Sequence, residues 1–98
     1  MTPPFLVRTT PHYERLARKL LRQHPDFSPI QERALAILGV DPMNRARNYH
    51  IKKLEGIAPD DGQWRLSLGR WRFRYELAIR DVVLKRCGLR REDTYRER

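Results

Sequence analysis

Cysteine and long apolar segments are nearly absent from this sequence. Its 98 residues include one cysteine, Cys87, so the chain has no disulfide framework and no metal site built from several cysteines. Cys87 stands in the run VVLKRCGL, which predicts a buried structural thiol. The N-terminal residues lack the basic start and apolar run of a secretory signal, and no segment is long enough to span a membrane. We therefore expect a cytoplasmic protein with no membrane partner.

Acidic residues are outnumbered by basic ones. The chain has 12 Asp and Glu against 21 Lys and Arg, and its net charge is +9. Segment 62–91 holds eight Arg and one Lys against Glu76 and Asp81, so it carries +7 of that charge. This concentration favours a polyanionic partner such as nucleic acid over a merely soluble basic surface. Three scattered histidines lack the spacing of metal ligands, and we expect no metal site.

Apolar and basic residues alternate through the most basic segment. A period of two is typical of half-buried antiparallel strands, in which each set of side chains occupies its own face of a sheet. One face can then pack a core. Trp64 and Trp71 could be platforms on which bases stack, but their alternation with the arginines favours a role as core anchors. The other face becomes a wall of guanidinium groups, which bind phosphate oxygens in a fork. The residues expected on that wall are Arg65, Ser67, Arg70, Arg72, Arg74 and Glu76.

The rest of the pattern predicts one domain over residues 1–98. A helix should begin with Thr10 as N-cap and Pro11 at its first position, and end before Pro25. Ser28 and Pro29 should open a second helix in the same way. Strands are expected at 4–9, 63–68, 70–78 and 81–88, with a short extended piece at 50–56. This order, β-α-α-β-β-β, predicts an α+β fold in which a helical hairpin packs on one face of an antiparallel sheet.

The basic residues of this predicted sheet are candidates for binding RNA. Arg74 has a second interpretation, since it could pair with Glu76 or another acid and be structural. A lysine near several arginines can act as a base, because like charges disfavour its protonated form. Lys52 and Lys53 are therefore candidate catalytic groups, or else solvated loop lysines, and His50 is either an acid–base group or structural. The candidate RNA-binding residues are His50, Arg65, Arg70, Arg74, Arg86 and Arg91.

Two motifs resemble the RelE/ParE superfamily of toxins from bacterial type II toxin–antitoxin systems. The first is LEG, followed after a turn by WRLSLGRWRFRY, which resembles a Leu-x-Gly step and two aromatic-Arg strands joined at a glycine. The second is the ending GLRREDTYR, which resembles a Gly-x-Arg step followed shortly by tyrosine. Together with the size, charge and element order, these motifs cover most of the chain.

The resemblance implies a RelE-like fold and a ribosome-dependent mRNA endoribonuclease that inhibits translation. In that branch the ribose 2′-OH attacks the neighbouring phosphate without a metal or other cofactor. By motif, Arg72 would clamp the phosphate, Arg90 would assist the transition state or the leaving group, and Tyr95 would stack on or orient a base. The chain departs from RelE where Arg65 and Ser67 replace lysines. Arginine is a poor base, which leaves Lys52, Lys53, His50 and Glu55 as candidates for that role.

Two other functions remain open at the level of sequence. The ParE-like branch shares the fold and inhibits DNA gyrase without cutting RNA, and a non-catalytic RNA- or ribosome-binding module would be equally basic. The many phosphate-directed arginines favour the RNA-cleaving branch. The expected partners are a cognate antitoxin, whose acidic or amphipathic segment would cover basic surface, and mRNA on the ribosome. No small-molecule cofactor is expected.

Overall fold

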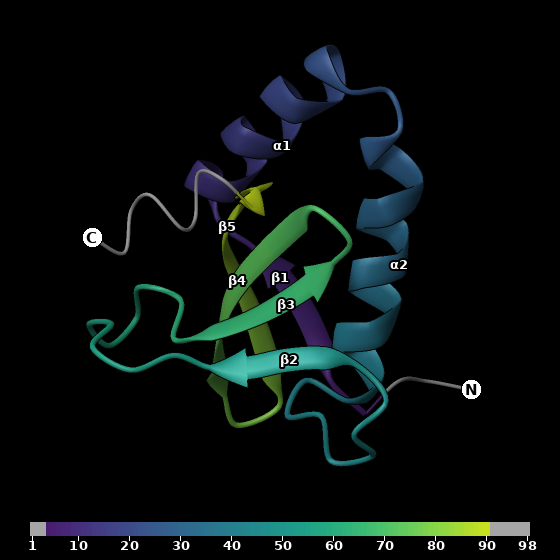
Figure 1. The fold of residues 1–98 in the computed structure, drawn as a ribbon. Coiled ribbons are helices and arrows are strands. Elements are labelled where there is room, and N and C mark those ends of the chain that lie inside the picture. Colours follow the sequence, from purple (N-terminus) through teal and green to yellow (C-terminus); the bar gives the residue numbers. More distant parts are fainter. Residues whose placement is uncertain (1–3, 91–98) are drawn as a thin grey trace.

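The computed structural model describes residues 4–90, which form two helices and five strands (Figure 1). The predicted α+β class is confirmed, and the extended piece near residue 50 is a further strand of the sheet. The elements in chain order are β1 (Leu6–Thr9), α1 (Pro11–Gln23), α2 (Phe27–Val40), β2 (His50–Lys53), β3 (Trp64–Leu68), β4 (Trp71–Ala78) and β5 (Asp81–Leu89).

The five strands form one mixed sheet in the order β1-β5-β4-β3-β2. Strands β2 to β5 are an antiparallel meander, whereas β1 lies parallel to β5, with Val7 opposite Val82. The expectation of a wholly antiparallel sheet is therefore wrong. A long connection that contains helices allows two strands of one sheet to run in the same direction. Here the return from β1 passes through both helices and three strands before β5 closes beside it.

The start of α1 follows the sequence prediction. Thr10 is the N-cap, its hydroxyl accepts a hydrogen bond from the Tyr13 amide at 3.2 Å, and Pro11 occupies the first helical position. The same hydroxyl donates to the Leu84 carbonyl at 3.0 Å, which ties the beginning of α1 to the interior strand β5.

The start of α2 differs from the prediction. The helix begins at Phe27 with Asp26 as N-cap, so the expected cap at Ser28 is wrong. The Phe27 ring is fully buried and lies 5.1 Å from the Trp71 ring and 6.0 Å from the Phe73 ring, measured between centroids. Burial of this ring accounts for the earlier start, because the chain must already be turning where Phe27 enters the core.

Both helices contribute to a core on one side of the sheet. α1 packs mainly on β5, α2 contacts β1 and β3, and the helices diverge from their short connection (Figure 1). Trp71 is 3% exposed and Cys87 is buried, as predicted, while Trp64 is half-buried and stacks on Tyr75. Neither helix of the described chain is long and apolar enough to cross a bilayer. The core residues are Tyr13, Ala17, Leu20, Phe27, Ala34, Ile37, Leu38, Leu66, Trp71, Phe73, Tyr75, Val82, Leu84 and Cys87.

Candidate nucleic-acid interface

The face of the sheet opposite the helices, here called the open face, carries a row of basic residues. Side chains directly opposite one another on paired strands point to the same side of a sheet. Neighbouring strands lie about 4.8 Å apart, so a row across four strands spans about 14 Å. This first row, called the loop row, consists of Lys52, Arg65, Arg74 and Arg86, which are register partners across β2, β3, β4 and β5.

A second row lies nearer the turn between β3 and β4. On each strand its member is two residues from the member of the loop row. This second row is called the turn row and consists of His50, Ser67 and Arg72, with Gly88 opposite Arg72 on β5. The two rows confirm the alternation expected for β3 and β4, because Leu66 and Phe73 between them are buried in the core. The register adds what the pattern could not, namely the partners from β2 and β5.

Arg74, in the middle of the loop row, is buried at 5% exposure. Its Nε donates to the Gly62 carbonyl and its Nη2 to the Asp61 carbonyl, each at 3.0 Å. Both carbonyls belong to the connection between β2 and β3, here called the 54–63 loop. Arg74 is therefore an anchor for this loop, and the RNA contact expected from the sequence does not fit its burial.

Glu76 holds the same loop from the next open-face position of β4. Its Oε2 accepts hydrogen bonds from the Gly62 amide at 2.8 Å and the Gln63 amide at 2.9 Å. Glu76 and Arg74 therefore both bind backbone groups of the 54–63 loop, which makes Arg74 structural. No pattern in the sequence links the 54–63 loop to β4, so the sequence did not predict that Arg74 and Glu76 together hold this loop.

The β5 end of the loop row is also tied to the 54–63 loop. Arg86 Nη2 lies 3.2 Å from Asp61 Oδ1, and the Arg86 side chain is 26% exposed. The neighbouring Lys85 Nζ lies 2.9 Å from Asp60 Oδ1. The register shift between Arg74 and Tyr75 leaves Lys85 as an extra residue of β5, with no partner on β4. Arg86 therefore contributes charge to the face while one of its nitrogens contacts a carboxylate.

Arg72, in the turn row, has different partners. Its Nη1 donates to the Gly69 carbonyl at 2.7 Å and to the Trp71 carbonyl at 2.9 Å, which folds the guanidinium against the β3–β4 turn. The side chain remains partly exposed, and His50 and Lys52 on β2 are exposed. Arg90 reaches the same end of the sheet, since its amide donates to the Arg70 carbonyl at 2.7 Å. The turn end thus brings Arg72, Arg90 and His50 to one region.

Two candidate residues lie elsewhere. Lys53 is opposite Trp64, which faces the helix side, and its Nζ lies 5.8 Å from the Trp64 ring centroid. Arg70 stands in the β3–β4 turn, where its guanidinium is 5.0 Å from the Trp71 ring and its Nη2 is 3.3 Å from Asp26 Oδ2. Both cations are engaged away from the open face. Arg91 and Tyr95 lie outside the described residues.

The acid–base groups of the two faces differ in kind. Burial raises the pKa of Tyr13 and of Tyr75 well above the usual value, so both phenols stay neutral at ordinary pH. Their hydroxyls donate to Gln31 Oε1 and to the Pro42 carbonyl, each at 2.6 Å, on the helix side. On the open face, the exposed groups able to exchange a proton include His50 and Lys52, with Glu55 in the loop beyond β2.

Comparisons of this chain with protein-family models, with curated proteins and with solved structures find no match. The arrangement of residues on the open face is therefore the basis for assigning a function. That face offers several guanidinium groups, a hydroxyl at Ser67 and exposed proton-exchanging groups on β2. Together these can bind a phosphate and move a proton beside it.

Proposed function

We propose that this chain is a toxin of the RelE/ParE superfamily, with a RelE-like fold including its helical hairpin, that cleaves mRNA on the ribosome. The observation that carries the proposal is the register of the open face. It gathers arginines from three strands with a histidine and a lysine from β2. The motifs around Trp64–Tyr75 and after Gly88 support the family assignment. An inert basic surface would not need proton-exchanging groups aligned with its arginines.

Arg72 is the proposed clamp on the scissile phosphate. Its side chain is partly exposed, and two turn carbonyls hold its Nη1 and so fix the orientation of the guanidinium. A pre-oriented guanidinium loses little conformational freedom when it binds an oxyanion. Arg90, at the same end of the sheet, would add positive charge beside the leaving group.

The proposed reaction is an internal transfer at phosphorus. The ribose 2′ oxygen forms a bond to phosphorus as its proton passes to a base, and the bond from phosphorus to the 5′ oxygen breaks as that oxygen takes a proton. The products are a 2′,3′-cyclic phosphate and a 5′-hydroxyl. Charge builds on the phosphorane in the transition state, so a fixed guanidinium stabilises the transition state more than the substrate.

His50 is the proposed base, and Lys52 is the alternative. An imidazole ordinarily exchanges a proton near neutral pH, which suits a base at cellular pH. His50 shares the turn row with Arg72, and Ser67 lies between them. Two strand spacings separate their backbones by about 10 Å, a gap that a nucleotide's ribose and phosphate can fill. Lys53 is not retained as a candidate because it contacts Trp64 on the other side.

A cognate antitoxin is the proposed protein partner. The net charge of +9 favours an antitoxin segment that is acidic or amphipathic. Such a complex should weaken as salt rises from about 50 to about 500 mM, because exposed charges separated by more than a few ångströms are then screened. Affinity unchanged over that range would indicate an apolar interface instead.

The experiment that tests the function is induction of the chain in a bacterium, with 5′-end mapping of a translated reporter mRNA. Wild type is compared with Arg72→Ala and with Arg33→Ala, a matched loss of one exposed arginine on α2. We expect translation-dependent cuts within codons for wild type and Arg33→Ala, and none for Arg72→Ala. Growth arrest without cuts would overturn the nuclease proposal and point to gyrase. The absence of any arrest would leave a binding module.

A further inference from the structure

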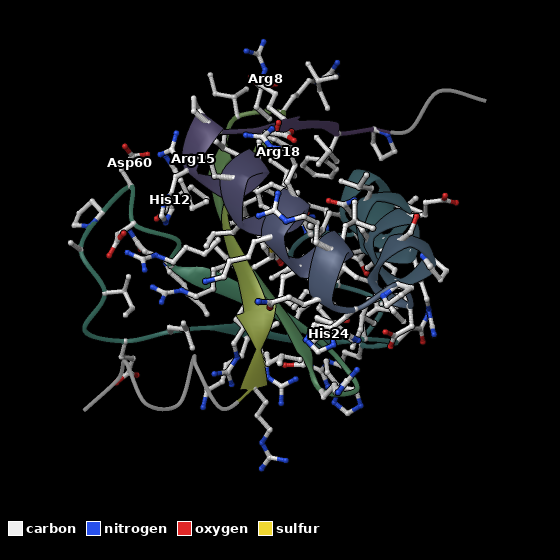
Figure 2. All side chains as sticks on the ribbon, turned by 90° about the horizontal axis from the view of Figure 1, so that it is seen from above. Arg8, His12, Arg15, Arg18, His24 and Asp60 are labelled. Atoms are coloured by element: carbon white, nitrogen blue, oxygen red, sulfur yellow. The ribbon has the colours of Figure 1, made fainter. Side chains whose placement is uncertain are left out.

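The outer side of α1 carries a second basic surface, which the proposed reaction does not use. Its members are exposed and follow the helical spacing i, i+3, i+4, i+7. Figure 2 shows Arg15 and Arg18 on the α1 ribbon, with His12 near its start and His24 beyond its end. This surface, called the α1 basic face, consists of Arg15, Arg18, Lys19 and Arg22.

The geometry of the helix makes this face continuous and opposite to the sheet. At 3.6 residues per turn, the four cations fall within a sector of about 100° and span about 10 Å along the axis. The buried residues Tyr13, Ala17 and Leu20 occupy the other side. The nearest acid in sequence, Glu14, lies outside the sector and accepts a hydrogen bond from the Thr9 hydroxyl. The face therefore has one sign of charge.

The four cations have no carboxylate partner among residues 4–90. By contrast, Arg8, Arg70, Lys85 and Arg86 each contact an aspartate. Four like charges on successive turns repel one another, and i,i+4 pairs of like charge destabilise a helix. Nothing in the packing of α1 requires them, whereas a polyanion would neutralise them.

We propose that the α1 basic face binds the phosphate backbone of double-helical RNA. An interfacial membrane helix presents an apolar side to the lipid, but the apolar side of α1 is buried in the core. Binding of single-stranded RNA relies on exposed aromatic rings. The only Phe, Tyr or Trp of α1, Tyr13, is 1% exposed, and the exposed ring of His12 is not a member of the α1 basic face. Cations at fixed spacing on a rigid helix suit the phosphates of a duplex, without sequence preference.

The inference deepens the proposed function and rests on it for its physiological partner, which would be a duplex of ribosomal RNA. The α1 basic face points away from the sheet, so it lies on the opposite side of the molecule from the open face. The described chain measures 33 × 32 × 26 Å. A protein of this size with basic surfaces on both sides can hold a message on one side while it docks on folded RNA with the other.

The test is the salt dependence of binding to a blunt RNA duplex of mixed sequence, measured by fluorescence anisotropy. Wild type is compared with R15Q/R18Q/K19Q/R22Q, in which glutamine keeps a good helix propensity. The control, R33Q/R45Q/R47Q/R80Q, removes the same charge from exposed positions on α2, the 41–49 segment and the β4–β5 turn. Thermal unfolding of each variant verifies that it is folded.

We expect the α1 variant to reduce the magnitude of the slope of log K against log salt by about 3.6, because each of the four phosphate contacts contributes about 0.9. The control should change it by less than about 1. Equal losses in both variants would overturn the proposal, since the charge would then act diffusely. The proposal would also be overturned if the α1 variant lost binding to an acidic peptide but kept its binding to the RNA duplex. That result would indicate a protein partner. Cleavage of mRNA by the Arg72→Ala variant is measured separately, because a loss of cleavage concerns the open face. Binding of the RNA duplex by this variant should be unchanged.

Discussion

Arg72 and Arg74 stand two residues apart on one strand, and the sequence treats them alike. Both are arginines between aromatic residues, and both point to the open face. Arg74 is nevertheless buried beneath the 54–63 loop, with its guanidinium bound to two loop carbonyls. Arg72 remains partly exposed beside a short turn. A period-two pattern fixes the direction of a side chain, but the connecting loops decide whether solvent or a ligand can reach it.

The two ends of the open face therefore have different roles in this account. At the loop end, Arg74 and Glu76 bind backbone groups of residues 61–63 and stabilise the fold. At the turn end, Arg72 is the proposed clamp on the scissile phosphate. This division predicts that substitutions at the loop end change stability first, and that substitutions at the turn end change RNA cleavage first.

Arg74→Ala should give the largest loss of stability. Removing a buried guanidinium leaves two loop carbonyls without their donor and opens space beneath the loop, which costs about 2–4 kcal/mol of unfolding free energy. Arg72→Ala should cost less than about 1 kcal/mol, because that side chain is partly exposed. Urea unfolding measures both, and equal losses would remove the distinction between the two ends.

Gly62→Ala should disturb the contact between the 54–63 loop and Arg74 from the loop side. Gly62 has φ +83°, and an added Cβ would lie 3.0 Å from the Arg74 Cβ. We expect a loss of about 2–3 kcal/mol from combined backbone strain and crowding. Gly56→Ala is the matched control, because Gly56 has φ +76° in the same loop with nothing within 4 Å of an added Cβ. It should cost about 1 kcal/mol. A control loss as large as that of Gly62→Ala would show that crowding against Arg74 is unimportant.

Alkaline pH should weaken the helix side of the sheet while the arginines of the open face stay charged. Burial raises the pKa of Tyr75, so its folded-state phenol keeps its proton when the unfolded chain begins to lose it near pH 10. Its contribution is therefore complete below about pH 10 and is lost as pH rises further. In urea unfolding between pH 9 and 11, the unfolding free energy of wild type should fall as pH rises. Tyr75→Phe should reduce that fall by up to about 1.4 kcal/mol per pH unit. If Tyr75→Phe leaves the dependence of the unfolding free energy on pH unchanged, the buried Tyr75 phenol does not cause the loss of stability.

Replacing the two carboxylates of the 54–63 loop, Asp60 and Asp61, should have the smallest effect on stability. Asp60 is 82% exposed in its pair with Lys85, and Asp61 is 49% exposed in its pair with Arg86. Exposed ion pairs are screened by water, so Asp60→Asn should cost at most about 0.5 kcal/mol and Asp61→Asn at most about 1 kcal/mol. Both losses should shrink in 0.5 M salt. A loss above about 2 kcal/mol for either variant would mean that ion pairs, and not Arg74, fasten the loop.

Local signals in the sequence predicted the parts of the fold that depend on neighbouring residues. The cap at Thr10 and the alternation through β3 and β4 were confirmed, because capping and pleating act over a few positions. The parallel pairing of β1 with β5 was not predicted, since it joins residues some 75 positions apart and leaves no period in either strand. The start of α2 was wrong because tertiary burial of Phe27 outweighed the cap signal.

The candidate site was predicted unevenly for the same reason. Alternation correctly separated Arg65, Arg72 and Arg74 from the core side. It could not distinguish Lys52 from Lys53, because the register of a short edge strand depends on its partner. It also could not foresee that the 54–63 loop covers Arg74, since a loop's path over a sheet is set by contacts distant in sequence.

The most direct test of the account is the rate of ribosome-dependent mRNA cleavage per folded molecule for Arg72→Ala and Arg74→Ala. Single-turnover rates on programmed ribosomes are measured at a temperature where unfolding curves show each variant folded, with Arg74→Lys replacing Arg74→Ala if the latter does not fold. We expect a loss of at least about 100-fold for Arg72→Ala, and a rate within about fivefold of wild type for the Arg74 variant. Equal losses, or a larger loss at Arg74, would contradict the assignment of the turn end as the site of RNA cleavage.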